Sequence, residues 1–272
     1  MSTTTLTAPT AAVARPARDV PAPIPTRRLA EVELRKMFDT RAGFWLMASV
    51  VILSVIATTA TIIFAPDDEL GYEAFAASVG FPMAVVLPMI AILSVTSEWS
   101  QRSALTTFTL VPSRKRVIAV KAALAVTIGV VSMLVAAAVG ALGNVVGSQL
   151  AGVPTTWDVS VADLALIILA NVLGMLVGFT LGVVFRSSPA AIVGYFVFSF
   201  VLTGVAEALS AVNEWFADNV SWLDFNTATG RLFEGADGLT GEVWAQVALT
   251  TTAWVLIPLA IGMRFLLRSE IK

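Results

Sequence analysis

Long apolar runs separated by short polar segments dominate this chain. Six runs have the length of a membrane-crossing helix, which needs about 20 apolar residues to cover about 30 Å of hydrocarbon. They cover residues 44–64, 75–95, 122–142, 164–184, 190–210 and 243–263. Strands of a membrane barrel would be about half as long and would alternate in polarity. The pattern therefore predicts an all-α polytopic membrane protein with six transmembrane helices.

The segment just before the first run, residues 27–42, is amphipathic. At 100° per residue, Ala30, Leu34, Met37 and Phe38 fall on one arc, while charged side chains lie elsewhere. The segment is predicted to be an interfacial helix, either a simple anchor in the headgroup plane or a helix that also contacts a partner.

Residues 1–26 are rich in Pro, Ala and Thr and contain no apolar run. We expect a disordered cytoplasmic tail here rather than a cleavable signal peptide. The six-helix domain is then expected to occupy residues 43–272. Because the chain contains neither His nor Cys, it offers no imidazole or thiolate for metal binding, acid–base chemistry or disulfides.

Charge is strongly segregated between the two sets of loops. If there are six spans, every Lys and Arg except Arg231 falls on one side, and the loops on the other side are acidic. Basic flanks mark the cytoplasmic side of membrane proteins. Both termini are therefore predicted to be cytoplasmic, with the protein in a bacterial plasma membrane.

A basic, polar stretch, residues 97–116, separates the second and third runs. Ser97 is expected to cap a short helix with Glu98 in its first turn, and Pro112 is expected to end that helix. Lys121 opens the third run and is expected to snorkel toward the headgroups. Ordinary positive-inside charge would explain the basic residues alone, but a bare topological loop needs only a few residues.

Part of this stretch resembles the intracellular loop of bacterial type 2 ABC transporter permeases. The resemblance lies in Glu98, the sequence SALTTFTLVPSR from Ser103 to Arg114, and Lys121. The chain departs from the family pattern where Arg102-Ser103 replaces the usual Gly-Thr pair. Six spans with both ends inside, preceded by an amphipathic connecting helix, also match the family.

The resemblance implies a coupling helix that contacts a separate cytoplasmic ABC ATPase. Glu98 and Arg114 would then fix the geometry of the loop. The residues implied in this contact are Glu98, Arg102, Leu105, Phe108, Leu110, Pro112, Ser113, Arg114 and Lys121. It also implies a connecting helix using Leu34, Met37 and Phe38, a second permease subunit (identical or paralogous), membrane lipids as partners, and no nucleic acid.

The chain has no G-x-x-x-x-G-K-[ST] sequence, so we do not expect it to be an enzyme or to bind ATP itself. No cofactor is expected on this chain; ATP and Mg would be bound by the partner ATPase. Gly174, Gly178 and Gly182 repeat every four residues in the fourth run and predict close helix packing, within one subunit or between subunits.

The outer loop, residues 206–242, mixes acidic and aromatic side chains. The aromatic content favours short re-entrant helices at the outer interface over a plain exposed loop. The residues expected to enter that interface are Trp215, Phe216, Trp222, Leu223 and Phe225.

Three classes of function compete. The favoured one is a transport permease that exports an amphipathic, lipid-like or drug-like substrate, because a path lined by apolar and small residues suits such cargo better than ions. A non-transporting membrane partner, such as an assembly or immunity protein, would have the same composition. Secondary transport is disfavoured because the spans lack a mid-depth acidic residue, and membrane enzymes are disfavoured because His, Cys and paired carboxylates are missing.

Overall fold

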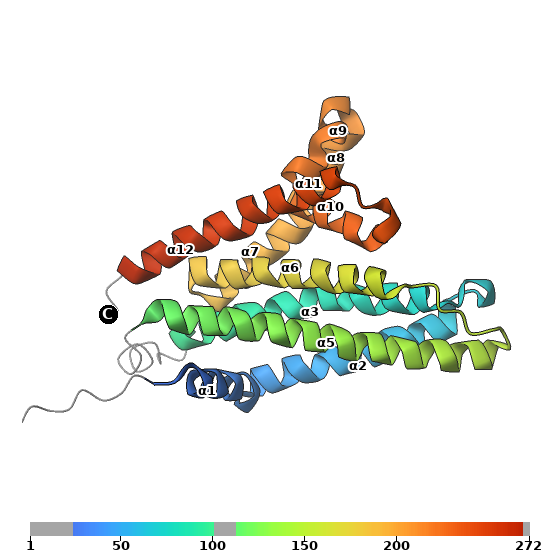
Figure 1. The fold of residues 1–272 in the computed structure, drawn as a ribbon, viewed down its shortest axis with the longest axis horizontal. Coiled ribbons are helices and arrows are strands. Elements are labelled where there is room, and N and C mark those ends of the chain that lie inside the picture. Colours follow the sequence, from blue (N-terminus) through green and yellow to red (C-terminus); the bar gives the residue numbers. More distant parts are fainter. Residues whose placement is uncertain (1–23, 101–112, 269–272) are drawn as a thin grey trace, which may run out of the picture.

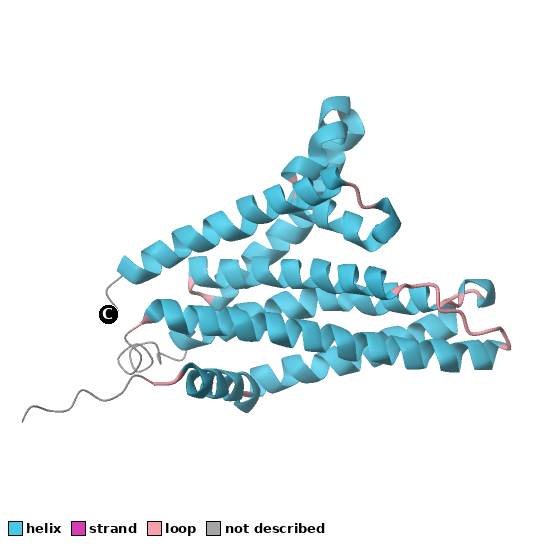
Figure 2. Cartoon of the chain, in the orientation of Figure 1, coloured by secondary structure: helices cyan, strands magenta, loops and turns pink. Residues whose placement is uncertain are grey.

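A computed structural model describes residues 24–100 and 113–268, and this part is helical with short loops and no strand (Figure 2). Six helical segments in it are long and apolar enough to cross a membrane. They are α2 (Arg41–Phe64), α3 (Tyr72–Ser100), α5 (Arg114–Ala151), α6 (Val161–Phe185), and the segments Ser188–Val212 and Gly241–Arg268. Each contains one of the predicted runs, which confirms the all-α, multi-pass class.

The fifth and sixth spans are each interrupted by a π-helical section. The fifth consists of α7 (Ser188–Phe196), the π-helical η2 (Val197–Leu202) and α8 (Thr203–Val212). The sixth consists of α11 (Gly241–Thr251), the π-helical η5 (Thr252–Leu256) and α12 (Ile257–Arg268). The two interruptions meet, because the rings of Phe198 and Trp254 lie 5.2 Å apart.

The centre of the bundle is α3, which packs against α2, α5, α6 and α7 (Figure 1). Pro88 lies inside α3 and has no N–H to give the carbonyl of Ala84, four residues earlier. The Tyr195 hydroxyl of α7 donates to that carbonyl at 2.7 Å. Tyr195 of α7 therefore supplies the hydrogen bond that Pro88 cannot give to the Ala84 carbonyl within α3.

Of the three glycines predicted to permit close packing, two face α3. A Cβ on Gly178 would lie 2.8 Å from the Pro88 carbonyl oxygen, and one on Gly182 would lie 3.4 Å from the Ile92 carbonyl oxygen. Gly174 makes no such approach within the described chain, because a Cβ there would meet nothing within 4 Å, so its predicted role in packing stays a prediction. Four residues turn a helix by about 400°, so successive glycines rotate by about 40° and the first leaves the contact face.

Short helices occupy the segment between the last two spans. They are α9 (Glu214–Leu223), α10 (Phe225–Gly230), η3 (Arg231–Glu234) and η4 (Ala236–Gly238). Trp215 and Leu223 are exposed, as a position at the membrane interface would require. Phe225, also expected at that interface, is instead buried in the protein core. The Trp254 indole donates to the Leu223 carbonyl at 3.0 Å, which attaches α9 to the π-helical section of the sixth span.

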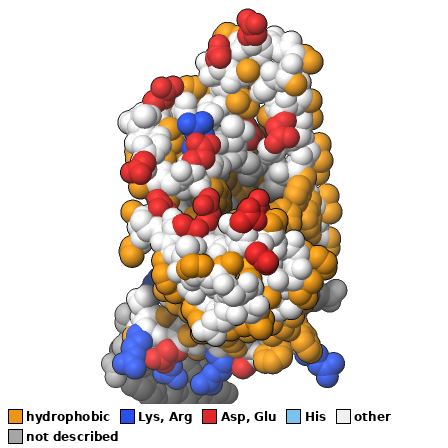
Figure 3. Space-filling view, turned by 90° about the vertical axis from the view of Figure 1, so that its right-hand side faces the viewer, with side chains coloured by type: hydrophobic (Ala, Val, Ile, Leu, Met, Phe, Trp, Pro, Cys, Tyr) orange, Lys and Arg blue, Asp and Glu red, His pale blue; other side chains and the backbone are white. Residues whose placement is uncertain are grey.

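The two ends of the bundle differ in charge. Asp and Glu side chains spread over the end where α5 stops and α6 begins, here called the acidic end (Figure 3). Acidic residues there include η1 (Asp67–Glu69), Glu73, Asp158 and Asp163. The opposite, basic end holds the start of α5, the end of α12 and both ends of the described chain (Figure 1).

Candidate functional site

At the basic end, α1 (Thr26–Asp39) lies against the bundle through one narrow face. Leu29 and Glu33 are buried, and Met37 packs on the main core. These three residues are spaced by four, so they share a face of the helix. Leu34 and Phe38, two members of the predicted apolar arc, are 39% and 45% exposed. The apolar arc is therefore divided: Ala30 and Met37 pack on buried clusters of the bundle, and Leu34 and Phe38 are exposed, where a helix at the membrane surface would meet lipid.

A tight elbow joins α1 to α2 at residues 40–43. Thr40 ends α1, and its side chain accepts a 3.0 Å hydrogen bond from the Gly43 N–H, which caps α2. A Cβ on Gly43 would lie 1.8 Å from the Met37 carbonyl oxygen. Only glycine fits this approach, so Gly43 constrains the angle at which α1 meets α2.

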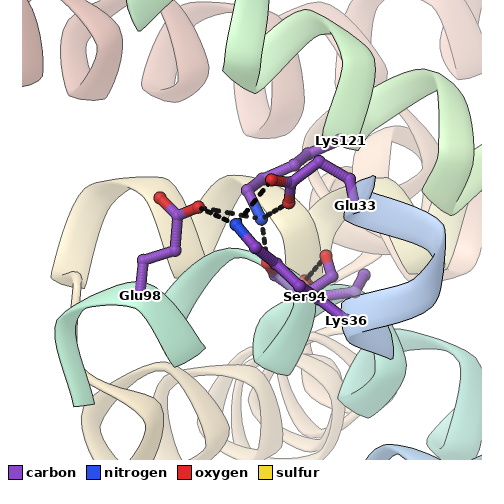
Figure 4. Close-up of polar contacts among 6 residues, drawn as sticks. Glu33, Lys36, Ser94, Glu98 and Lys121 are labelled. Atoms are coloured by element: carbon purple, nitrogen blue, oxygen red, sulfur yellow. Dashed lines mark hydrogen bonds and ion pairs between the residues drawn. The ribbon is translucent and has the colours of Figure 1, made fainter. Parts of the chain in front are cut away.

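Beneath α1, four charged side chains from three helices form a closed cycle, here called the charge ring (Glu33, Lys36, Glu98 and Lys121; Figure 4). Lys36 Nζ lies 2.8 Å from Glu33 Oε1 and 3.5 Å from Glu98 Oε1. Lys121 Nζ pairs with Glu33 Oε2, lies 3.4 Å from Glu98 Oε1, and donates to the Ser94 carbonyl at 2.9 Å. Each anion thus touches both cations.

Three members of the charge ring are withdrawn from solvent. The side chains of Glu33 and Glu98 are 2% exposed and that of Lys121 is 5% exposed, whereas Lys36 is 42% exposed. Burial alone would raise the pKa of Glu33. The neighbouring ammonium groups of Lys121 and Lys36 lower that pKa by more than burial raises it, so it lies below the ordinary 4.5. Two positive and two negative groups leave the ring neutral, which makes its burial tolerable.

Glu98 is the least firmly held member of the charge ring. Neither of its carboxylate oxygens accepts a hydrogen bond from the described residues, and both are buried. Among the residues that the structure describes, Glu98 is held by two ion pairs, with Lys121 at 3.4 Å and with Lys36 at 3.5 Å. A buried carboxylate without hydrogen bonds is costly, so Glu98 is the member whose position is most easily changed.

Two local expectations for this region are corrected. Ser97 and Glu98 lie inside the end of α3, not at the start of a new helix, because α3 continues to Ser100. Lys121 does not extend toward the headgroups, because Glu33 and the Ser94 carbonyl bind its ammonium group inside the bundle. A buried carboxylate on a neighbouring helix is a stronger partner than a distant interface.

The start of α5 provides a second set of contacts. Arg114 Nη1 donates to the Leu266 carbonyl near the end of α12 at 2.7 Å. Arg116 Nη2 donates to Thr26 Oγ1 at the start of α1 at 2.6 Å. Ser113 precedes the helix, and its carbonyl accepts from the N–H groups of Arg116 and Val117. These bonds join α5 to both α12 and α1.

The structure thus brings together Glu98 and Lys121 in the charge ring, and Arg114 of α5 is hydrogen-bonded to α12. Five of the predicted coupling residues lie outside the described residues: Arg102, Leu105, Phe108, Leu110 and Pro112. Sequence reasoning missed Glu33 and Lys36 as partners of Glu98. The available signal was Glu33 itself, an acidic residue four positions from both Leu29 and Met37 on the same helical face.

Within residues 24–100 and 113–268, no group of three or more acidic side chains is arranged to hold a metal ion. A scan against protein-family models matches no family, and a search of curated proteins finds no matching relative. The site that the structure describes joins α1, α3 and α5 through the charge ring, and α5 to α12 through Arg114.

Proposed function

We propose that this chain is the membrane-spanning permease subunit of an ABC transporter, powered by a separate ATPase that contacts residues 97–116. Support comes from the six spans, the preceding interfacial helix and the loop motif between the second and third spans. The basic end would be cytoplasmic, because Lys and Arg accumulate on the inner side of membranes. Two permease subunits, identical or paralogous, would pair with two ATPases in a bacterial plasma membrane.

The observation that carries this function is how the loop is attached. Glu98 lies at the end of α3, and Arg114 is the first residue of α5. Glu98 contacts Lys36 of α1 and Lys121 of α5, while Arg114 binds the Leu266 carbonyl of α12. A displacement of the loop would therefore act on four helices at once. Buried, directional contacts transmit such a displacement better than a loop held only by solvent-exposed charge.

ATP and Mg would be bound by the partner, and this chain would supply the transport path. The substrate is proposed to be amphipathic, lipid-like or drug-like and to be exported, because the spans are lined mainly by apolar and small side chains. This makes the chain a transport subunit and not an enzyme.

The test is purification of the tagged full chain together with the ATPase encoded next to its gene, followed by reconstitution into liposomes. We expect a stable complex whose ATP hydrolysis is sensitive to vanadate and falls when Glu98 is replaced by Gln. Glu31→Gln is the matched control, since Glu31 is exposed on α1 and pairs only with Arg27 in the described part of the chain. Absence of any ATPase in the purified complex would instead favour a non-transporting membrane partner.

A further inference from the structure

A cavity of about 140 Å³ lies between the elbow at residues 40–43 and the charge ring. Leu46, Met47, Ile90 and Leu93 from α2 and α3 form its apolar wall. Glu33, Lys36 and Lys121 form its charged side. An engineered apolar cavity of about 150 Å³ is large enough to bind benzene, so this one has room for about six carbon atoms.

The shape of the cavity follows from the chain direction at the elbow. Gly43 and Thr40 both line it, and the close approach of Gly43 to the Met37 carbonyl fixes the angle between α1 and α2. Lys36 and Ala42 are the exposed lining residues, so the cavity opens beside them. The space is bounded by backbone geometry as well as by side chains that can move.

The charge ring that borders the cavity is neutral overall, but Lys36 and Lys121 line the cavity together with Glu33, whereas Glu98 is not among the lining residues. Lys121 is buried and already donates to Glu33 and to the Ser94 carbonyl. Lys36 is half exposed at the opening; within the described residues it donates one hydrogen bond, to Glu33, and forms a longer ion pair with Glu98 at 3.5 Å. An ammonium group has three N–H donors, so Lys36 can bind a further acceptor at the opening.

We propose that this cavity binds an anionic amphiphile, with the first part of one alkyl chain inside and the acidic head on Lys36. Apolar walls favour the alkyl chain, and a charge-assisted bond to Lys36 favours an anion over a neutral head. The acid is either a fatty-acid carboxylate or a phospholipid phosphate. The site is a property of this chain alone and does not depend on transport or on an ATPase.

The experiment uses the purified full chain in nanodiscs of zwitterionic lipid. Three photoactivatable probes carry the same chain with a diazirine within about six carbons of the head: a fatty acid, a phosphatidylglycerol and a neutral fatty alcohol. Labelled positions are mapped by mass spectrometry. We expect saturable labelling of the segments containing Met47 and Leu93 by an acidic probe, and about tenfold less by the alcohol.

Three variants separate this site from general lipid contact. Lys36→Gln should lower labelling by the acidic probe about tenfold, whereas Lys36→Arg should retain it. Leu46→Trp should block the cavity while leaving the charge ring intact. Lys115→Gln, at an exposed basic residue of the same end that does not line the cavity, should change nothing.

Labelling by the fatty acid alone would identify a carboxylate ligand, and labelling by phosphatidylglycerol alone would identify a lipid phosphate. Either result supports an anionic amphiphile site. Equal labelling by the alcohol, loss of saturation, or labelling confined to outward-facing residues such as Trp45 would overturn it.

Discussion

Glu33 of α1 and Lys121 of α5 form a buried ion pair although 88 residues separate them in the chain. The pair links α1 to the bundle, and Lys36 and Glu98 close the ring around it. Removing one partner of such a pair leaves the other charge buried without compensation. The position of α1 therefore depends on both residues.

Lys121→Ala should destabilise the protein by about 3–5 kcal/mol, which corresponds to a melting temperature lower by roughly 10 °C. Two carboxylates would then be buried with only Lys36 nearby. Exchanging the charges, Glu33→Lys with Lys121→Glu, should recover part of this loss, measured by thermal melting of the detergent-purified protein. Recovery would stay partial because glutamate cannot donate to the Ser94 carbonyl. A double variant no more stable than the worse single variant would contradict direct pairing.

The same pair predicts a dependence on pH. The folded-state pKa of Glu33 lies below 4.5, so its ionised form stabilises the folded protein above that pH, and the stabilisation is lost as the pH falls through the folded-state pKa. The difference in melting temperature between wild type and Glu33→Gln should therefore be constant above about pH 5 and shrink below about pH 4.5.

Glu31→Gln is the control for this titration, because Glu31 is 61% exposed and lies on the same helix. Its melting curve should run parallel to that of the wild type across the acidic range. A difference for Glu33→Gln that stays constant down to pH 3 would show that Glu33 does not titrate in the way its neighbours imply.

The lengths of the apolar runs were enough to predict the six spans, because run length is a local property of the chain. The contacts between helices were not predictable to the same degree. In the sequence, Glu33 is one of several polar residues of an amphipathic helix. Its partner Lys121 is 88 residues away and becomes its neighbour only when α1 and α5 pack together. Pro88 signals a carbonyl without its helical donor, but nothing in the sequence identifies Tyr195 as the residue that replaces it.

Helix rotation explains the other discrepancies in the same terms. The arc that contains Leu34 and Phe38 and the glycine repeat that contains Gly174 are read from spacing within one helix, and spacing does not say which side meets the bundle. The π-helical sections at η2 and η5 also depend on tertiary contacts, including the one between Phe198 and Trp254.

Gly178 and Gly174 form a matched pair for testing helix packing. Gly178→Ala places a methyl group 2.8 Å from the backbone oxygen of Pro88, which cannot move away as a flexible side chain would. We expect a destabilisation of about 1–3 kcal/mol. Gly174→Ala meets open space and should be neutral or stabilising by up to about 1 kcal/mol, since alanine favours helix. Thermal melting of both variants in the same detergent checks this, and equal effects would refute the assigned contact face.

Arg114 tests whether contacts at the basic end matter for coupling as well as for stability. Its guanidinium binds the Leu266 carbonyl at 2.7 Å, so Arg114→Glu removes a charge-assisted hydrogen bond between α5 and α12 and places a carboxylate near a carbonyl oxygen. Such bonds contribute about 1.5–3 kcal/mol, and ATP hydrolysis by the reconstituted complex should fall by about tenfold or more.

Lys115→Glu makes the same charge change at the next residue, which is exposed, and should retain most of the activity. Membrane insertion, measured by the yield of folded protein, should be the same for both variants. Equal hydrolysis by Arg114→Glu and Lys115→Glu would mean that net charge at this end, and not the link to α12, supports coupling.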